Sequence, residues 1–326
     1  MSFVSRRFAV LASLFLAVSP SLTFFSRYAI HETLFSTLTL SFSVGILLWF
    51  CRGSRVGVYL AIASVAGLIC TKETWIISVF CVALATLSLT NPKKLVERVR
   101  RDWGHFVIAF IGLIFFVAVV FSAGFVWFDG LREMLLAIPQ WVSRNSSDIG
   151  HHKPFWYYLK VIISTERHLL DLFLILIAVV LYRSVIGAKP FFDLGESRVA
   201  RFLLVWGVSS LIVYSAIAYK TPWLIINITL PLILLASWWL DRFMKMGRAQ
   251  LVLGTFLTII LLLASIGNTF RYNFNRIKVG SQEKQIPGAV PYGNGNPFSY
   301  VHTHKGMLTL LDDIQTYREK LPTVRI

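Results

Sequence analysis

The sequence predicts an all-α fold, a polytopic membrane helical bundle of about nine spans. Of the 326 residues, 56% are hydrophobic and only 15% are charged, against about 25% charged residues in soluble domains. Uninterrupted apolar runs of about 17–25 residues, long enough to cross a bilayer as helices, recur along the chain. Together these observations exclude a soluble enzyme, a disordered chain and a disulfide scaffold. The runs do not alternate with the period of a strand, which excludes a membrane barrel.

The apolar segments follow one another through mostly short connections. They cover residues 8–26, 33–51, 56–70, 75–90, 105–128, 169–186, 201–218, 222–240 and 250–268. Thr71-Lys72-Glu73-Thr74 separates the third from the fourth, because two charges at the centre of one span would be costly. Pro20 makes the first segment irregular, and Thr221-Pro222 is a typical helix start.

The distribution of Lys and Arg predicts the orientation of the bundle. With a cytoplasmic N-terminus, the inner segments contain 16 of these residues, whereas the outer loops before the tail contain eight, five of them in one long loop. Cytoplasmic loops of membrane proteins carry such an excess. We therefore expect a multi-pass protein of a prokaryotic plasma membrane, with its C-terminus outside. The same rule explains the net charge of +16 without a nucleic acid partner.

The short outer connections combine cations with aromatic residues, and two of them also carry carboxylates. They contain, in chain order, Arg27, Tyr28 and Glu32; Lys72, Glu73 and Trp75; and Tyr219, Lys220 and Trp223. Ionisable groups at the membrane surface are costly unless they are paired or functional. Snorkelling cations with an aromatic belt are the alternative interpretation. That alternative does not explain carboxylates beside the cations.

The long outer connection, about residues 129–168, predicts two interfacial helices separated by a polar stretch. Apolar residues at helical spacing predict the first helix, and Pro154-Phe155-Trp156-Tyr157-Tyr158 begins the second. His151 and His152 lie side by side between them, which favours a polar loop or a substrate contact over a metal site.

Residues 269–326 predict a polar extracytoplasmic tail with a small α/β fragment, following a transmembrane region of residues 1–268. The expected elements are a strand at 298–302 and a helix at 306–320. His302 and His304 have no third ligand nearby, so we expect no metal. The three cysteines, Cys51, Cys70 and Cys81, fit no metal motif and are expected to be structural thiols. Motifs of nucleotide, zinc and serine hydrolysis do not occur.

Four short motifs in order resemble those of a known class of membrane enzymes. They are Ser19-Pro20 followed by Phe25-Ser26-Arg27-Tyr28-Ala29 and Glu32; Thr71-Lys72-Glu73-Thr74; His152-Lys153-Pro154-Phe155-Trp156-Tyr157-Tyr158; and Asn296-Pro297-Phe298-Ser299-Tyr300-Val301. The chain resembles the GT-C class of integral-membrane glycosyltransferases, in particular the protein O-mannosyltransferase-like and aminoarabinose-transferase-like enzymes. It is most similar to the "flippase activity-associated" membrane protein family, and the resemblance covers most of the chain.

The resemblance implies sugar transfer from a polyprenyl-phosphate donor to a glycan, lipid or protein acceptor on the outer face, without a further cofactor. It implies phosphate-binding cations at Arg27, Lys72 and Lys220, since charge-assisted bonds to phosphate are strong. The implied contacts to the sugar or the prenyl chain are Trp75, His152, Tyr157, Tyr158 and Trp223. Glu32 and Glu73 are the candidate catalytic carboxylates.

One departure from the family bears on activity. The family's catalytic acid lies in a first outer loop that precedes the Ser19-Pro20 region, and this chain begins shortly before Ser19. The expectation is therefore an N-terminally truncated chain that lacks its principal base and transfers sugar poorly. A non-catalytic flippase-associated or assembly protein is the alternative function. A transporter is disfavoured because no internal repeat is evident.

The short outer turns also predict a shared site. Arg27, Glu32, Lys72 and Glu73 belong to spans joined by short connections, so their side chains can reach one another. We expect them to converge in one outward-facing cavity with Tyr157 or Tyr158 at its rim.

Overall fold

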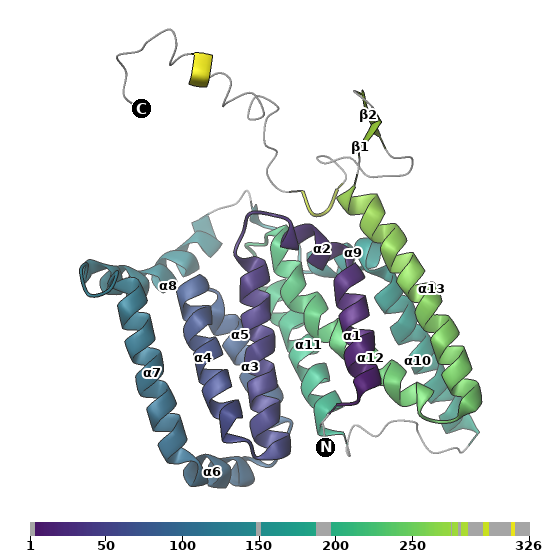
Figure 1. Ribbon diagram of the computed structural model, residues 1–326, viewed down its shortest axis with the longest axis horizontal. Helices are drawn as coiled ribbons and strands as arrows, with labels where there is room; N and C mark the ends of the chain where they lie inside the picture. The colour runs from purple at the N-terminus through teal and green to yellow at the C-terminus, as the bar shows by residue number, and fades with distance from the viewer. Residues whose placement is uncertain are drawn as a thin grey trace.

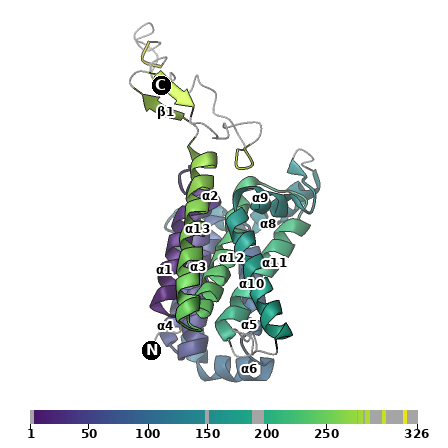
Figure 2. The same ribbon diagram turned by 90° about the vertical axis from the view of Figure 1, so that its right-hand side faces the viewer.

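Helices make up nearly all of the secondary structure in the part of the chain that is described. The computed structural model describes residues 4–147, 151–186, 197–274, 276–279, 282–285, 296–299 and 314–316. The helices are α1 (Arg6–Val18), α2 (Pro20–Ser26), α3 (Glu32–Arg52), α4 (Arg55–Thr71), α5 (Trp75–Leu87), α6 (Pro92–Arg101), α7 (Trp103–Phe121), α8 (Asp129–Ser147), α9 (Tyr157–Thr165), α10 (Arg167–Val185), α11 (Arg198–Ala216), the 3₁₀ turn η2 (Pro222–Ile225), α12 (Ile226–Met244) and α13 (Arg248–Asn273). Most of the helices stand side by side in a bundle (Figure 1; Figure 2). Helix α6 lies at one end of the bundle, which we call the α6 end, and α8 and α9 lie at the other, which we call the α8 end.

The predicted all-α membrane fold is confirmed in its coarse form. Among the described residues, five helical segments are long and apolar enough to cross a membrane: α3, α7, α11, η2 together with α12, and α13. Counting the bent pairs α1–α2 and α5–α6 as one span each raises the number to seven. The expected count of about nine is therefore not reached by helix length and composition. The break expected at Thr71–Thr74 is present, since α4 ends at Thr71 and α5 begins at Trp75.

Local sequence signals explain where the first helices end. Ser19 has an extended backbone and caps α2 through a hydrogen bond that its side chain accepts from Leu22 N, while Pro20 occupies the first helical position. The axes of α1 and α2 consequently meet at a bend of 64°. Gly53 ends α3 in the left-handed conformation, with a φ of 66°, which glycine adopts without a steric penalty.

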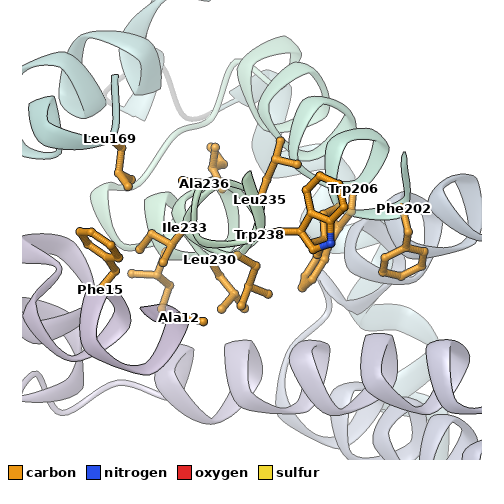
Figure 3. Close-up of a cluster of buried hydrophobic side chains, with 14 of the residues drawn as sticks. Ala12, Phe15, Leu169, Phe202, Trp206, Leu230, Ile233, Leu235, Ala236 and Trp238 are labelled. Carbon is orange, nitrogen blue, oxygen red and sulfur yellow. The ribbon is translucent and has the colours of Figure 1, made fainter. Parts of the chain in front are cut away.

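Helix α12 forms the centre of the bundle. Nearly all of its residues are buried, and it contacts α1, α10, α11 and α13. Figure 3 shows Phe15 of α1, Leu169 of α10 and Trp206 of α11 on different sides of α12. Helix α7, in contrast, is largely exposed, because only two of its residues are buried. An apolar helix that leaves most of its surface uncovered is suited to contact lipid.

Glycines allow α3 and α4 to approach each other closely. A Cβ atom added at Gly57 would lie 2.5 Å from the carbonyl oxygen of Gly45 and 2.6 Å from the backbone nitrogen of Trp49. Small residues at an interface are what lets membrane helices come this close. The position of Gly57 therefore fixes the distance between the two helices that carry Glu32 and Lys72 at their α8 ends.

We expect Gly57→Ala to lower the free energy of unfolding by about 1–3 kcal/mol, because the added methyl group meets backbone atoms that cannot rotate away. The matched control is Gly112→Ala in α7, where an added Cβ meets nothing within 4 Å. That control should be neutral or stabilising by up to about 1 kcal/mol, since alanine favours the helix. Unfolding of both variants in mixed detergent micelles measures the difference. Equal stability would contradict the close packing of α3 and α4.

The elements expected in the long connection and the tail are found in part. Helices α8 and α9 lie within the predicted ranges. In the tail, β1 (Arg276–Val279) and β2 (Gln282–Gln285) form an antiparallel hairpin. The predicted strand at 298–302 is wrong for Phe298 and Ser299, which are not in a strand, and residues 300–302 lie outside the described residues. Of the predicted helix at 306–320, residues 314–316 are described, and they are helical. The histidines His302 and His304 lie outside the described residues.

The motif Asn296-Pro297-Phe298 docks onto the bundle at the α8 end. Asn296 Nδ2 donates to the Tyr272 carbonyl oxygen at 3.0 Å, and the buried Phe298 ring packs on Phe24 and Phe25 of α2 with centroid distances of 5.2 and 5.6 Å. The buried Phe298 ring thus gives the otherwise polar tail an apolar contact with the bundle. This part of the tail is therefore attached to α2 and α13.

Candidate functional site

An ion pair between Glu32 and Lys72 joins α3 to α4 at the α8 end. Glu32 is the first residue of α3 and is 1% exposed, and Lys72 follows the last residue of α4 with an extended backbone. The Lys72 ammonium donates a hydrogen bond to Glu32 Oε1. On the other oxygen, His31 Nε2 lies 3.9 Å from Oε2. A buried carboxylate without a cation is strongly destabilising, so Lys72 supplies the partner that Glu32 needs in this buried position.

A cavity of about 140 Å³ opens beside this ion pair. Its walls come from the α4–α5 turn, from α5, α8 and α11, and from the segment that leads into η2, with Lys72, Glu73, Thr74, Ile77, Trp141, Tyr214, Ile217, Tyr219, Thr221, Trp223 and Leu224 as lining residues. The Lys72 ammonium lies 5.8 Å from the centroid of the Trp223 ring. Cation, carboxylate and aromatic ring thus meet in one place, and a few convergent polar groups in a concave site are typical of small-molecule binding sites.

Two polar groups of the cavity are available to a ligand. Thr74 Oγ1 is buried and has no hydrogen-bond partner among the described residues. Buried hydroxyl groups are nearly always hydrogen-bonded, so water or a ligand would fill this role. Glu73 likewise forms no ion pair or hydrogen bond with any described residue and lines the cavity. Of the two carboxylates, Glu73 is therefore the one that a ligand in the cavity can contact.

A short β-bridge builds the wall of the cavity that carries Tyr219 and Thr221. His152 pairs with Tyr219 in antiparallel fashion, and Lys220 N donates to the His151 carbonyl oxygen at 3.0 Å. The His151 ring also stacks on the Tyr219 ring at 4.8 Å. The bridge ties the long connection to the segment before η2. The two adjacent histidines thus help to position a cavity wall.

Lys220 is buried within this wall and does not line the cavity. Its ammonium donates to the carbonyl oxygens of Lys153, at 3.1 Å, and of Ile217. Burial lowers the pKa of Lys220 below its usual value. Tyr158 supports the same segment, because its hydroxyl donates to the Thr221 carbonyl oxygen at 3.0 Å. Lys220 and Tyr158 therefore fix the backbone that presents Thr221 and Trp223.

The remaining predicted site residues lie around the cavity or apart from it. Arg27 is not among the described cavity-lining residues: its guanidinium donates to the Asn273 carbonyl oxygen at 3.3 Å and lies 4.5 Å from the Phe274 ring centroid. Trp75 begins α5 directly after the cavity turn. Tyr157 packs against Tyr158 with a centroid distance of 5.1 Å. The structure thus brings Lys72, Glu73 and Trp223 together in the cavity, and Glu32 pairs with Lys72 without lining the cavity itself.

A second polar cluster, around Glu166 between α9 and α10, was not anticipated from the sequence. Glu166 Oε1 accepts from Ser19 Oγ at 2.6 Å, Ser21 N at 2.9 Å and Ser21 Oγ at 2.6 Å. His168 Nε2 lies 3.5 Å from the other oxygen. Burial raises the pKa of Glu166 above its usual value. The Glu166 carboxyl group therefore fixes the α1–α2 bend. In the sequence, only the Ser19-Pro20 motif pointed to this bend, and nothing linked it to Glu166.

Comparison of the chain with protein families, with curated proteins and with solved structures found no match.

Proposed function

We propose that the protein is a membrane glycosyltransferase, or part of one, that takes a sugar from a polyprenyl-phosphate donor at the α8 end. The observation that carries this proposal is the cavity in which Lys72, Glu73 and Trp223 meet. A phosphate-linked sugar offers an anion, hydroxyl groups and an apolar ring face, which these three side chains can bind. The resemblance of the motif Thr71–Thr74 to GT-C enzymes supports the same function.

Three residues of the cavity have roles in the proposed reaction. The acceptor oxygen forms a bond to the anomeric carbon of the sugar while the bond from that carbon to the phosphate oxygen breaks. Lys72 binds the phosphate and stabilises the charge that develops on the leaving group. Glu73 accepts the proton of the acceptor hydroxyl, and Trp223 stacks on the sugar ring.

The proposed topology places the α8 end outside the membrane. We propose nine crossings, with the short α4 and α5 as separate spans and the N-terminus in the cytoplasm of a prokaryotic cell. The basic helix α6, with Arg98, Arg100 and Arg101 in its last turn, lies at the opposite end of the bundle from α8 (Figure 1). The positive-inside rule then supports a cytoplasmic α6 end.

The alternative function is a non-catalytic protein that handles lipid-linked sugars. The size of the cavity favours it, because about 140 Å³ is less than the roughly 300 Å³ or more of most small-molecule sites. A space of this size admits a phosphate group without enclosing a whole sugar. In this alternative Lys72 binds the lipid phosphate and no transfer follows.

Binding of a labelled polyprenyl phosphate to the purified full chain tests the phosphate site that both functions share. Lys72→Ala is expected to weaken binding about tenfold or more, since the charge-assisted bond is lost. Glu32→Gln is expected to have the opposite effect and to strengthen binding, because the ammonium is no longer neutralised by a carboxylate. Titration of the label in detergent micelles gives both affinities.

Lys160→Ala is the matched control, because this exposed cation lies in α9 at the same end and does not line the cavity. Its affinity should equal that of the wild type. Unchanged binding in Lys72→Ala, or an equal loss in Lys160→Ala, would remove the phosphate site from the proposed function.

A further inference from the structure

A second, larger cavity lies at the α6 end of the bundle, far along the helices from the proposed sugar site. Its volume is about 480 Å³, which falls within the usual range for small-molecule sites. It opens between the first turns of α1 and α11 and the last turn of α12, with Cys51 of α3 on another side. The site already described does not use it.

The charges of this cavity are unbalanced in favour of cations. Arg198, Arg242 and Lys245 line it, against the single carboxylate of Asp241. Asp241 is already satisfied, because Ser5 Oγ donates to its Oδ1 at 2.8 Å and Lys245 pairs with its Oδ2. Among the described residues no carboxylate pairs with Arg198 or Arg242. These two guanidinium groups are therefore available to an anion.

Two helix N-termini add to the positive potential. Ser5 caps α1 and Ser197 caps α11, and both residues line the cavity. The unpaired backbone N–H groups of a helix start attract anions, and two starts converge here. The cavity also has an apolar side made by Phe8 and Trp238, and the Arg242 guanidinium lies 5.7 Å from the Trp238 ring centroid.

We propose that this cavity binds a phosphate-bearing anion through Arg198 and Arg242. Guanidinium groups match phosphate oxygens in a planar, two-bond geometry that a lysine ammonium cannot provide. In the proposed topology these helix ends lie at the depth of lipid headgroups, so the phosphate can belong to an anionic phospholipid or be free in solution. The proposal is independent of the sugar site, which lies at the other end of the bundle.

The test measures binding of two probes, phosphatidylglycerol and inorganic phosphate, to the full chain in detergent micelles. Native mass spectrometry counts bound lipid, and a competition arm with inorganic phosphate distinguishes the two sources. We expect Arg198→Ala and Arg242→Ala each to weaken binding about tenfold. Both side chains are exposed, so neither variant should fail to fold.

Arg100→Ala, an exposed cation of α6 at the same end, is the matched control and should change the affinity by less than about twofold. Binding of the lipid alone would assign the site to a lipid headgroup, and displacement by inorganic phosphate would assign it to a free phosphate; both support the proposal. Absence of binding by either probe, or an equal loss in Arg100→Ala, would overturn it.

Discussion

If Glu73 is the general base of the proposed transfer, replacing it with glutamine is expected to lower the rate of sugar transfer by about 10²–10⁴-fold, the usual contribution of such a base. Glu73 lines the cavity beside Lys72 and has no ion-pair or hydrogen-bond partner among the described residues. Glutamine keeps the size and the hydrogen-bonding oxygen of the side chain but cannot accept a proton. Binding of the polyprenyl-phosphate donor should therefore stay close to that of the wild type.

The measurement is transfer from a panel of labelled donors, with donor affinity determined on the same preparations. Glu133→Gln in α8 is the control, because this exposed carboxylate does not line the cavity. Full transfer by Glu73→Gln would exclude Glu73 as the base. A wild-type chain that binds the donor and transfers nothing would favour the non-catalytic alternative.

Replacing Glu166 with alanine is expected to lower the free energy of unfolding by about 3–5 kcal/mol. Three donors, Ser19 Oγ, Ser21 N and Ser21 Oγ, would lose their common acceptor in a buried place, at about 1–3 kcal/mol each before relaxation. Glu97→Ala, an exposed carboxylate of α6, should have little effect. Unfolding in mixed micelles compares the two, and similar stabilities would contradict the role of Glu166 at the α1–α2 bend.

The same carboxyl group predicts a pH dependence of defined sign. Because burial raises the pKa of Glu166, the folded chain keeps its proton to a higher pH than the unfolded chain does. Its contribution to stability is fully present below the ordinary glutamate pKa of about 4.3 and is lost as the pH rises through the raised value. Glu166→Gln cannot ionise, so this part of the pH profile should become flat. A profile identical to that of the wild type would contradict the raised pKa.

The sequence was sufficient to predict the features that depend on local signals. Apolar run length predicted the membrane helices, and the charged Lys72-Glu73 pair correctly predicted the break between α4 and α5. The number of crossings could not be derived in this way, because α4 has only 17 residues and the chain bends between α1 and α2. Short and broken helices depend on their neighbours for burial, and the run length of a single segment contains no information on neighbours.

Features that depend on tertiary packing were harder to predict. The pairing of Lys72 with Glu32 follows from two short turns, whereas Arg27 binds the C-terminal end of α13, almost 250 residues away in the chain. Glu166 approaches Ser19 and Ser21 across 147 and 145 positions. Contacts of such separation leave no periodic or local pattern, so only the packing of α1, α2 and α10 around α12 reveals them.

The most direct test of the proposed donor site is photocrosslinking of the full chain with a polyprenyl phosphate that carries a photoreactive group next to the phosphate. We expect the label on peptides that contain residues 72–77 and 219–224, because these segments line the cavity. Excess unlabelled polyprenyl phosphate should remove it, and Lys72→Ala should reduce it about tenfold. Label confined to the largely exposed helix α7, or unaffected by competitor, would contradict a donor site in this cavity.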